Sequence, residues 1–238
     1  MKAMIFSAGL GTRFKPWTDE HPKALALVNG KPLIQRNIEY LQRYGINEVV
    51  VNVHHFAGQL IDEIERHNGW GSHIIFSDEK AELLETGGGL LHARHLLENG
   101  QPFITINADI LTDFPIDELI KVYQQQQALI AFAVSNRSSS RHFLFDENYR
   151  LSGWENQATG ETKIVREVSQ PKSLAYGCVA LFDPAIFDLI PQRGKFSLTE
   201  TYLSLAANEL IIGCEASGVN FIDVGKPESV AIAESIFE

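Results

Sequence analysis

The regular alternation of strand-like and helix-like segments is the feature that most limits how this chain can fold. The first 135 residues alternate short apolar, β-branched runs with segments whose apolar side chains recur every three or four positions. This pattern is typical of right-handed βαβ units, so we predict a doubly wound α/β fold with a mostly parallel sheet. The expected strands are residues 2–7, 48–54, 73–77 and 103–107, and the expected helices are residues 32–44, 58–67, 88–97 and 116–127.

The middle of the chain departs from this rhythm. Between residues 138 and 170, short polar-interrupted strands are separated by turn residues, which predicts a small antiparallel insertion. The alternation then resumes, and no Pro/Gly/Ser-rich linker divides the chain, so we expect residues 1–238 to form a single domain. The later elements expected are strands at 176–182 and 220–223, and helices at 184–190, at 198–207 and from Pro227 onward.

The composition excludes several classes of protein. A formal net charge of −10 would repel polyanions, so we expect no nucleic-acid partner, and a phosphate site would need locally concentrated cations or a metal ion. No run of 18 or more apolar residues is present, and the amino end is typical of a strand rather than a signal peptide. Cys178 and Cys214 lie in apolar segments, which suits small buried side chains in a reducing compartment. We therefore expect a cytoplasmic protein without a membrane partner.

A glycine-rich loop follows the first predicted strand and is the strongest candidate for a binding site. In the segment Ser7-Ala8-Gly9-Leu10-Gly11-Thr12-Arg13, glycines allow positive φ angles, so several N–H groups can point at one anion. Phe14 stands where a dinucleotide fingerprint needs a small residue, and the Gly-Lys-Ser/Thr ending of a P-loop is missing. A phosphate loop of another kind is predicted, with a plain strand-to-helix turn as the alternative. The cations near it are Arg13, Lys15, Lys23 and Lys31.

A spaced set of motifs extends from this loop toward the end of the chain. The first comprises the segment from Ala8 to Arg13, then Pro16, Thr18 and Pro22-Lys23-x-Leu25. Those that follow are Gly30-Lys31-Pro32-Leu33-Ile34, Leu84-Glu85-Thr86-Gly87-Gly88-Gly89, Asn107-Ala108-Asp109 and Ile222-Asp223-Val224-Gly225-Lys226-Pro227. In identity and order these motifs resemble those of the sugar-1-phosphate nucleotidyltransferases, enzymes that join a nucleoside triphosphate (NTP) to a sugar-1-phosphate and release pyrophosphate.

The resemblance implies roles for the residues of the loop. Arg13 would neutralise charge on the β- and γ-phosphates and Lys23 would meet the reacting phosphates, which makes these two the catalytic candidates. Such transfer concentrates negative charge on oxygens, so catalysis depends on alignment and electrostatic stabilisation more than on a protein nucleophile. The nucleotide-binding residues that the resemblance implies are Ala8, Gly9, Gly11, Thr12, Arg13, Lys23 and Gly88.

Two aspartates lie in apolar segments far apart in the sequence. Asp109 follows the predicted strand 103–107, at the carboxyl end where open α/β sheets bind ligands, and Asp223 lies 114 residues later in a second apolar strand. The resemblance implies that this pair holds Mg²⁺, whose preference for carboxylate, phosphate and water oxygens fits two protein ligands. Each aspartate taken alone could instead cap a helix or a turn. Asp113 is a weaker candidate, because Thr112-Asp113 can equally well introduce the helix that begins near Ile116, and it is left out of the predicted metal site.

Further segments resemble the parts of the family that contact the base and the sugar. The segment from Glu85 to Gly89 opens a helix and offers free N–H groups, and Gly177 matches a glycine that lies under the sugar. The substrate-binding residues predicted in this way are Glu85, Thr86, Gly87, Asn107 and Gly177.

The Glu-Thr-Gly-Gly-Gly form most resembles N-acetylmuramate-1-phosphate uridylyltransferases and some mannose-1-phosphate guanylyltransferase-like proteins. We therefore expect UTP and an N-acetylmuramate-1-phosphate-like substrate. A mannose- or heptose-1-phosphate guanylyltransferase using GTP, and a non-catalytic nucleotide-binding regulatory module, are the alternatives. A monomer or small homo-oligomer is expected.

The sequence departs from the family pattern at a position that matters for the sugar phosphate. Ser169-Gln170-Pro171 stands where many members have Glu-Lys-Pro, which removes a lysine that in many relatives grips the sugar phosphate. Either Lys163, Lys172 or another cation supplies that charge, or the substrate binds differently. Smaller departures are Ala24 in place of a frequent proline and Asn107-Ala108-Asp109 in place of a commoner Gly-Asp ending.

Overall fold

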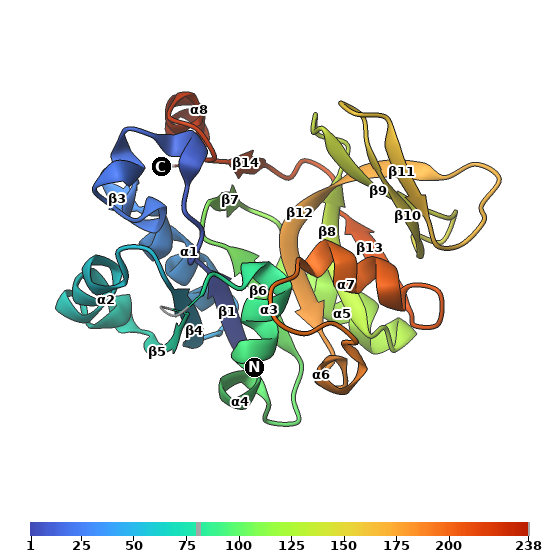
Figure 1. Cartoon of the computed structure of the whole chain (residues 1–238), viewed down its shortest axis with the longest axis horizontal. Helices are drawn as coiled ribbons and strands as arrows, with labels where there is room; N and C mark the ends of the chain where they lie inside the picture. The colour runs from blue at the N-terminus through green and yellow to red at the C-terminus, as the bar shows by residue number, and fades with distance from the viewer. Residues whose placement is uncertain (80–81, 238) are drawn as a thin grey trace.

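A computed structural model describes residues 1–79 and 82–237 of the chain. Four parallel strands form its centre: β1 (Lys2–Phe6), β4 (Glu48–Val53), β5 (His73–Asp78) and β6 (Phe103–Asn107). They lie in the order β5, β4, β1, β6 within a larger mixed sheet (Figure 1). The prediction of an α/β fold with mostly parallel central strands is confirmed.

The order of the parallel strands creates a switch point beside β1. From β1 the chain passes to β4 and β5 on one side, and then returns to β6 on the other side. Loops that leave the carboxyl ends of β1 and β6 therefore diverge, and open α/β sheets bind their ligands at such a point. The register places Phe6 beside Asn107, so the residues that follow the two strands begin at the same level of the sheet.

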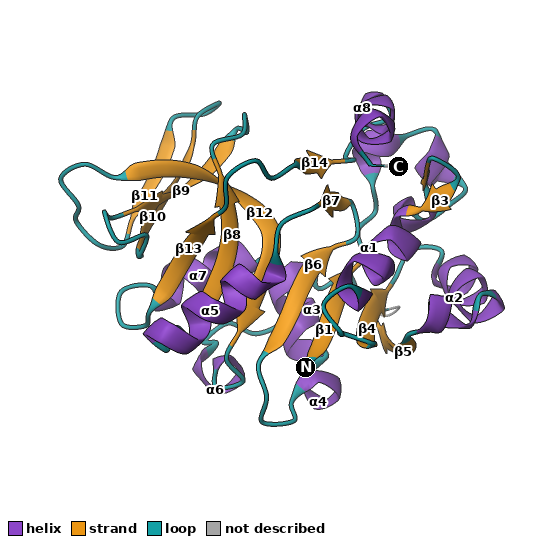
Figure 2. Ribbon diagram, turned by 180° about the vertical axis from the view of Figure 1, so that it is seen from behind, coloured by secondary structure: helices purple, strands orange, loops and turns teal. Residues whose placement is uncertain are grey.

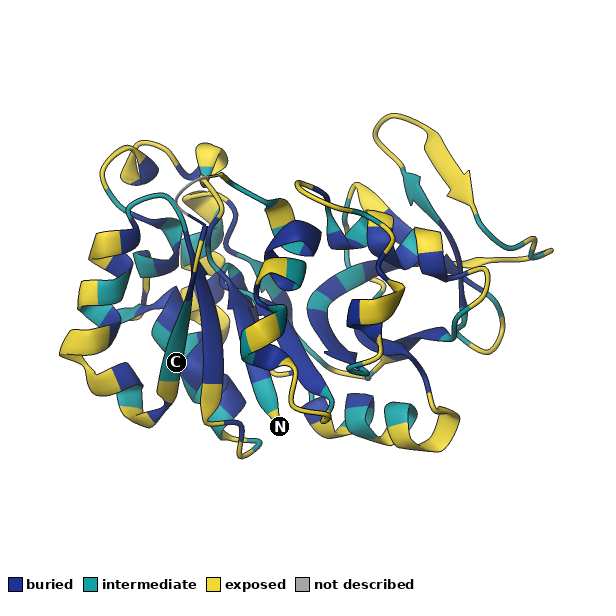
Figure 3. Cartoon of the chain, turned by 60° about the horizontal axis from the view of Figure 1, so that its bottom comes forward, coloured by how far each residue is buried: buried dark blue, intermediate teal, exposed yellow. Residues whose placement is uncertain are grey.

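Both faces of β1, β4 and β6 are buried, which accounts for their near-continuous apolar runs. Ala3 and Ile5 contribute to one core with helices α1 (Leu33–Gln42), α2 (Ala57–Arg66) and α5 (Ile116–Gln126). Met4 and Phe6 contribute to a second core with α3 (Glu85–His92), α4 (Arg94–Leu97) and α7 (Leu198–Leu205). Figures 1 and 2 show the two helix layers from opposite sides, and Figure 3 shows buried strands between partly exposed helices. Among the described residues, 1–79 and 82–237, the structure contains no helix that could span a lipid bilayer.

The second half of the sheet is organised around one long strand. β12 (Lys172–Phe182) pairs antiparallel with β6, with β8 (Ile130–Ser135) and with β9 (Arg141–Phe145). Beyond β9 the sheet continues with β10 (Leu151–Asn156) and β11 (Glu161–Ile164), while β13 (Ile211–Glu215) runs parallel to β8. The antiparallel strands predicted between residues 138 and 170 are therefore present, and they extend the main sheet through β12.

Several predicted boundaries were wrong. The prediction contained no strand at β7 (Ile110–Thr112), β8 or β13, and it began β12 at Tyr176 rather than at Lys172. The predicted helix at 88–97 is two helices, α3 and α4, which meet at Ala93. Pro32 belongs to the short strand β3 (Lys31–Pro32), and α1 begins after it. β8 and β13 are almost entirely buried, and such short apolar runs lack the alternation that would separate them from a buried helix.

Short elements near the carboxyl end support the loop that follows β1. β14 (Phe221–Asp223) pairs antiparallel with β7, and β2 (Leu27–Val28) pairs with β3. Helix α8 (Glu228–Ile236) packs against this region. A small separate core unites these parts and includes Phe14, Val28, Leu33, Val224 and Ala233.

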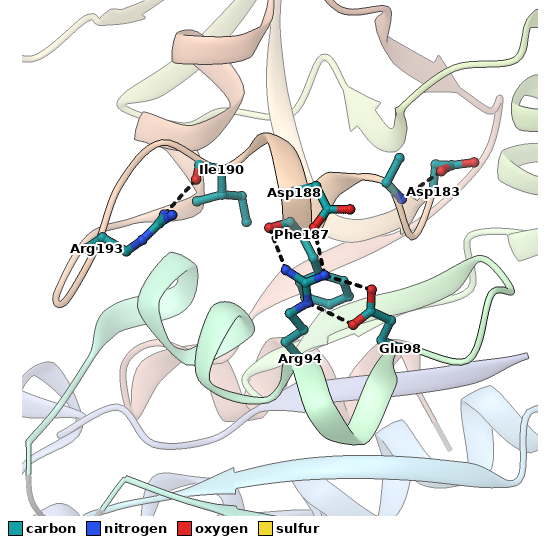
Figure 4. A network of polar contacts seen from close by, with 8 residues as sticks. Arg94, Glu98, Asp183, Phe187, Asp188, Ile190 and Arg193 are labelled. Carbon is teal, nitrogen blue, oxygen red and sulfur yellow. Dashed lines mark hydrogen bonds and ion pairs between the residues drawn. The ribbon is translucent and has the colours of Figure 1, made fainter.

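Arg94 joins α4 to α6 (Ile186–Leu189), two helices that flank different strands (Figure 4). Its guanidinium donates to the Glu98 carboxylate at 2.8 and 2.9 Å. It also donates to Asp188 Oδ1 at 2.7 Å and to the Phe187 carbonyl at 3.2 Å. The network therefore ties the segment that follows β12 to the helix that precedes β6.

Candidate active site

The loop after β1 is held in shape by residues that follow it in the sequence. Gly11 has a left-handed backbone, with a φ angle of 61°. A Cβ atom there would lie 2.8 Å from Thr18 Cγ2 and 3.2 Å from Lys23 Cβ, so a side chain would force its neighbours to move. Thr18 Oγ1 also donates a hydrogen bond to the Gly11 carbonyl at 2.9 Å. The contacts among these three residues give a physical reason for the spacing of the first motif.

Asn52, which no sequence motif marked, anchors the start of the same loop. Its Oδ1 accepts hydrogen bonds from the N–H groups of Ser7 and Ala8 at 2.6 and 3.3 Å, and its Nδ2 donates to Glu79 Oε1 at 2.7 Å. Glu79 is only 2% exposed and also accepts from the Leu84 N–H group at 3.2 Å. The available signal was a single polar residue near the carboxyl end of the apolar strand β4.

Replacing this asparagine should lower both stability and affinity for triphosphates. Asn52→Ala would leave buried amides and the Glu79 carboxylate without their partner, and we expect the free energy of unfolding in urea to fall by about 2–4 kcal/mol. The loop amides would lose their alignment, so the Kd for a nucleoside triphosphate should rise. Asn208→Ala, at an exposed position after α7, is the control and should change neither quantity. An Asn52→Ala protein as stable as the wild type would contradict the anchoring role.

Asp109 and Asp223 meet although they are far apart in the sequence. β14 pairs with β7 so that Asp223 lies opposite Ile110, and the Val224 N–H group donates to the Asp109 carbonyl at 2.8 Å. Lys23 Nζ lies 2.5 Å from Asp109 Oδ2, whereas Asp223 Oδ1 is buried without a hydrogen-bond partner among the described residues. Burial, and then the nearby charge of Asp109, raise the pKa of Asp223 above its usual value. The pair therefore presents negative charge that would attract a cation.

Gly225 allows Arg13 to approach this pair. A Cβ atom at Gly225 would lie 2.6 Å from Asp223 Oδ1 and 3.2 Å from Arg13 Nη2. By contrast, Lys15 and Lys31 form ion pairs with neighbouring carboxylates, at 2.8 and 2.7 Å. Of the four cations noted in the sequence, Arg13 and Lys23 therefore border a cavity at the site, whereas Lys15 and Lys31 form ion pairs elsewhere on the surface.

The loop, Lys23 and Asp109 border a cavity of about 410 Å³ at the carboxyl ends of β1 and β6. Its size suits a small-molecule site, and it lies at the switch point of the sheet. Segments far apart in the chain therefore converge on one site. The predicted residues that line the cavity are Ala8, Gly9, Gly11, Thr12, Arg13, Lys23, Glu85, Thr86, Asn107 and Asp109. Lining residues to which no site role was assigned from the sequence include Asn52, Leu83 and Gly225.

The glycines at the start of α3 serve packing. The N–H groups of Gly87 and Gly88 both donate to the Phe196 carbonyl, at 2.9 and 3.1 Å. A Cβ atom at Gly87 would clash with the Phe196 ring, and one at Gly88 would clash with the Gly194 carbonyl oxygen. The expectation that these two amides are free to bind a ligand is therefore wrong, and neither residue is among those that line the cavity. Glycine is required here because a second segment of the chain approaches the helix.

Gly177 on β12 is also closed off by protein. A Cβ atom there would lie 2.5 Å from the Phe221 ring and 3.0 Å from the Ala133 carbonyl oxygen. The residue is buried and is not among those that line the cavity, and its contact with the sugar stays a prediction. Its small size lets β12 approach β14, the strand that carries Asp223.

Enlarging this glycine should damage the site indirectly. Gly177→Ala would displace Phe221 and lower the free energy of unfolding by about 1–3 kcal/mol. The displacement would extend to Asp223 on the same strand. We expect a lower melting temperature and a lower kcat, with a smaller effect on substrate KM values. Gly58→Ala, on an exposed part of α2 where described atoms leave open space around Cβ, is the control and should reduce neither. A changed KM for the sugar substrate at an unchanged melting temperature would instead indicate direct contact.

The two lysines considered for the sugar phosphate lie elsewhere. Lys163 Nζ is 5.5 Å from the centroid of the Trp154 ring, and Lys172 Nζ is 4.0 Å from that of the Tyr149 ring. Both lysines belong to the antiparallel strands, and neither is among the residues that line the cavity. A role for either lysine in binding the sugar phosphate stays a prediction.

Known proteins resemble this chain in both sequence and fold. A family model described as Nucleotidyl transferase matches residues 2–143. The N-acetylmuramate alpha-1-phosphate uridylyltransferase of Caulobacter vibrioides is 31% identical over 98% of this chain and 95% of that protein. The mannose-1-phosphate guanylyltransferase catalytic subunit beta of Xenopus tropicalis is 29% identical over 96% of this chain and 62% of that protein. Among solved structures, HddC from Yersinia pseudotuberculosis, complexed with GMP-PN, gives a TM-score of 0.81 at 22% identity, covering 100% of this chain and 99% of that one.

The comparisons show the family to which the chain belongs. The family model spans more than half of the chain, including the glycine loop, Lys23 and Asp109 that border the cavity. The uridylyltransferase relative extends the likeness over almost the whole chain. The chain therefore belongs to the nucleotidyl transferase family, and it is a sugar-1-phosphate nucleotidyltransferase.

Proposed function

We propose that this enzyme transfers a uridylyl group from UTP to an N-acetylmuramate-1-phosphate-like sugar, giving a UDP-sugar and pyrophosphate. The observation that carries the reaction is the cavity at the switch point of the sheet, where the glycine loop, Lys23 and Asp109 converge. An oxygen of the sugar phosphate attacks the α-phosphorus of the nucleotide in line with the departing pyrophosphate. This route needs alignment and charge stabilisation and no protein nucleophile.

The residues of the chain align the reactants and stabilise charge. Loop N–H groups near Gly9 and Gly11 bind triphosphate oxygens, and Arg13 stabilises the departing pyrophosphate. Lys23, whose side chain is 12% exposed, meets the reacting phosphates, and its partial burial strengthens its electrostatic effect. The remaining residues proposed to contact the substrates are Ala8, Thr12, Glu85, Thr86 and Asn107.

Asp109 and Asp223 are suited to a magnesium ion. Asp223 Oδ1 is buried without a hydrogen-bond partner in the described structure, and the charge of Asp109 opposes its ionisation, which a divalent cation would relieve. Within residues 1–79 and 82–237, no three or more His, Cys, Asp and Glu side chains are grouped so that they could hold a metal ion, so water and phosphate oxygens would complete the coordination, as Mg²⁺ prefers. We propose that both aspartates hold Mg²⁺, which when bound would neutralise charge on the phosphate oxygens.

The choice of base and sugar is supported by the relatives. Uridylyltransferases from Caulobacter vibrioides and Neisseria meningitidis match over 95% and 93% of their own length, whereas the Xenopus tropicalis guanylyltransferase matches over 62%. A guanylyltransferase acting on mannose- or heptose-1-phosphate is the second candidate, because several guanylyltransferases are similar over 96% of this chain. A cytoplasmic role in making cell-wall or polysaccharide precursors belongs to the same proposal.

A substrate panel tests this assignment. Purified protein is incubated with Mg²⁺, each of UTP, GTP and CTP, and each of several sugar-1-phosphates, while pyrophosphate release is followed. We expect the highest kcat/KM with UTP and N-acetylmuramate-1-phosphate. The highest value with GTP and mannose- or heptose-1-phosphate would favour the second candidate. Release of no pyrophosphate with any pair would contradict both.

A further inference from the structure

Arg137 lies outside every motif found in the sequence. It follows β8, and its Nη2 donates a hydrogen bond to the Tyr176 carbonyl on β12 at 3.0 Å. Its Nε is buried and has no hydrogen-bond partner among the described residues. A guanidinium carries five N–H donors, and leaving a buried one unused is unfavourable unless a ligand satisfies it. The arginine is therefore held in place with donor capacity to spare.

The strand that fixes Arg137 is distorted at this point. The register between β12 and β8 shifts between Tyr176 and Ala180. Within this bulge, Cys178 has a left-handed backbone with a φ angle of 56°. Bulges redirect side chains and are common beside active sites, and a non-glycine residue in the left-handed region persists where its surroundings hold it there. The bulge thus supplies a rigid carbonyl that orients the guanidinium.

The carbonyl that binds Arg137 lies beside the strand that carries Asp223. Tyr176 precedes Gly177, and a Cβ atom at Gly177 would lie 2.5 Å from the ring of Phe221 on β14. Lys23 and Arg13 belong to the amino-terminal loop region, whereas Arg137 comes from the antiparallel half of the sheet. Arg13 and Arg137 are therefore supplied by two different parts of the fold.

In-line transfer needs a cation for the sugar phosphate, and the antiparallel half of the sheet can supply it. The attacking oxygen approaches the α-phosphorus on the side opposite to the departing pyrophosphate. Because Arg13 and the glycine loop would bind the triphosphate, the incoming sugar phosphate needs a cation from another element. Arg137 comes from such an element, whereas Lys163 lies over the Trp154 ring and Lys172 over the Tyr149 ring.

We propose that Arg137 binds the phosphate group of the sugar-1-phosphate, and that it takes the role of the lysine missing from Ser169-Gln170-Pro171. This inference rests on the proposed reaction. The guanidinium offers neighbouring N–H donors to the phosphate oxygens, and such charge-assisted pairs are stronger and more directional than neutral hydrogen bonds. The Tyr176 carbonyl keeps the guanidinium fixed, so little freedom is lost when the phosphate binds.

Steady-state kinetics of Arg137→Met test this role, using whichever pair of NTP and sugar-1-phosphate the wild type turns over fastest. We expect the KM for the sugar-1-phosphate to rise about 10- to 100-fold, because hydrogen bonds to a charged group are lost. The KM for the NTP should stay within about twofold, and so should the Ki of the unphosphorylated parent sugar as a competitive inhibitor. A merely structural role would change all three constants together.

The matched control is Arg141→Met, an exposed arginine at the start of β9, which should leave all three constants unchanged. Arg137→Lys retains the charge and should show a smaller rise in the same KM, which keeps the test valid if the methionine variant fails to fold. An unchanged KM for the sugar-1-phosphate, or a rise confined to the KM for the NTP, would overturn the proposal. Because the best pair is used, a different base or sugar preference would overturn the proposed function without affecting this test.

Discussion

Lys23→Ala should lower kcat by about 100- to 1,000-fold, the loss typical of removing one preorganised electrostatic group. The ammonium lies 2.5 Å from Asp109 Oδ2, and its side chain is 12% exposed, so water would replace it poorly. Charge on the phosphates grows during the reaction, so the lysine stabilises the transition state more than the bound substrate. The Kd for the NTP, measured by calorimetry, should therefore change by less than about tenfold.

Lys15→Ala provides the comparison for this variant. Lys15 carries the same charge in the same segment, but it pairs with Asp19 at the surface, where their side chains are 59% and 50% exposed. Such exposed pairs contribute little, so kcat should stay within about twofold of the wild type. If Lys23→Ala weakened NTP binding as much as it lowered kcat, the lysine would be a binding group and not a catalytic one.

Asp223→Asn should produce the other large effect, a fall in kcat of at least about 100-fold, because Mg²⁺ would lose one of its two protein ligands. Addition of Mg²⁺ should raise the melting temperature of the wild type but not that of the variant, since a ligand stabilises the state that binds it. Differential scanning fluorimetry with and without Mg²⁺ measures this difference. Equal stabilisation of both proteins by Mg²⁺ would show that Asp223 is not a metal ligand.

Without metal, the same substitution should stabilise the protein at neutral pH. Burial and the charge of Asp109 raise the pKa of Asp223 above 3.8, so the folded state holds this proton more tightly than the unfolded chain does. The resulting stability is fully present below the unfolded pKa and is lost as the pH rises through the folded pKa. Metal-free Asp223→Asn should consequently melt above the wild type near pH 7–8, and the difference should shrink toward about pH 4.

Asp113→Asn distinguishes this effect from a general consequence of removing a carboxylate. Asp113 accepts hydrogen bonds from the Asn220 backbone N–H group at 2.7 Å and from its side-chain amide at 2.8 Å. Its replacement should lower the melting temperature at neutral pH and leave the Mg²⁺ response intact. The two substitutions are therefore expected to shift stability in opposite directions.

The parallel half of the fold could be predicted because its physical requirements leave a pattern in the sequence. Strands buried on both faces alternate with amphipathic helices, and the predicted strand at residues 103–107 coincides with β6. β8 begins shortly after α5 ends and is an almost continuous apolar run. Hydrophobic periodicity therefore could not show whether this segment is a strand or a continuation of the helix. β13 contains Gly213 and lies in a short apolar stretch, and its pairing with β8 depends on contacts distant in sequence.

The site was less predictable than the fold, because one residue type serves different purposes. A glycine that admits a ligand and a glycine that admits an aromatic ring look alike in sequence, and Gly87 and Gly177 prove to be of the second kind. No sequence motif could identify Asn52 either, because its partners Ser7 and Glu79 become its neighbours only when β1, β4 and β5 align. By contrast, Gly11 and Lys23 meet within one short continuous segment, so their spacing can be read directly from the sequence.

The pairing of β14 with β7 has a consequence for how this enzyme is made. A chain still attached to the ribosome that has emerged as far as β13 already contains the glycine loop, Lys23 and Asp109, but it lacks Asp223. Closing a loop of more than 100 residues to bring the second carboxylate into place is entropically unfavourable until the rest of the sheet has formed. Turnover should therefore begin only after translation has passed β14, so an unfinished chain would not consume nucleotide.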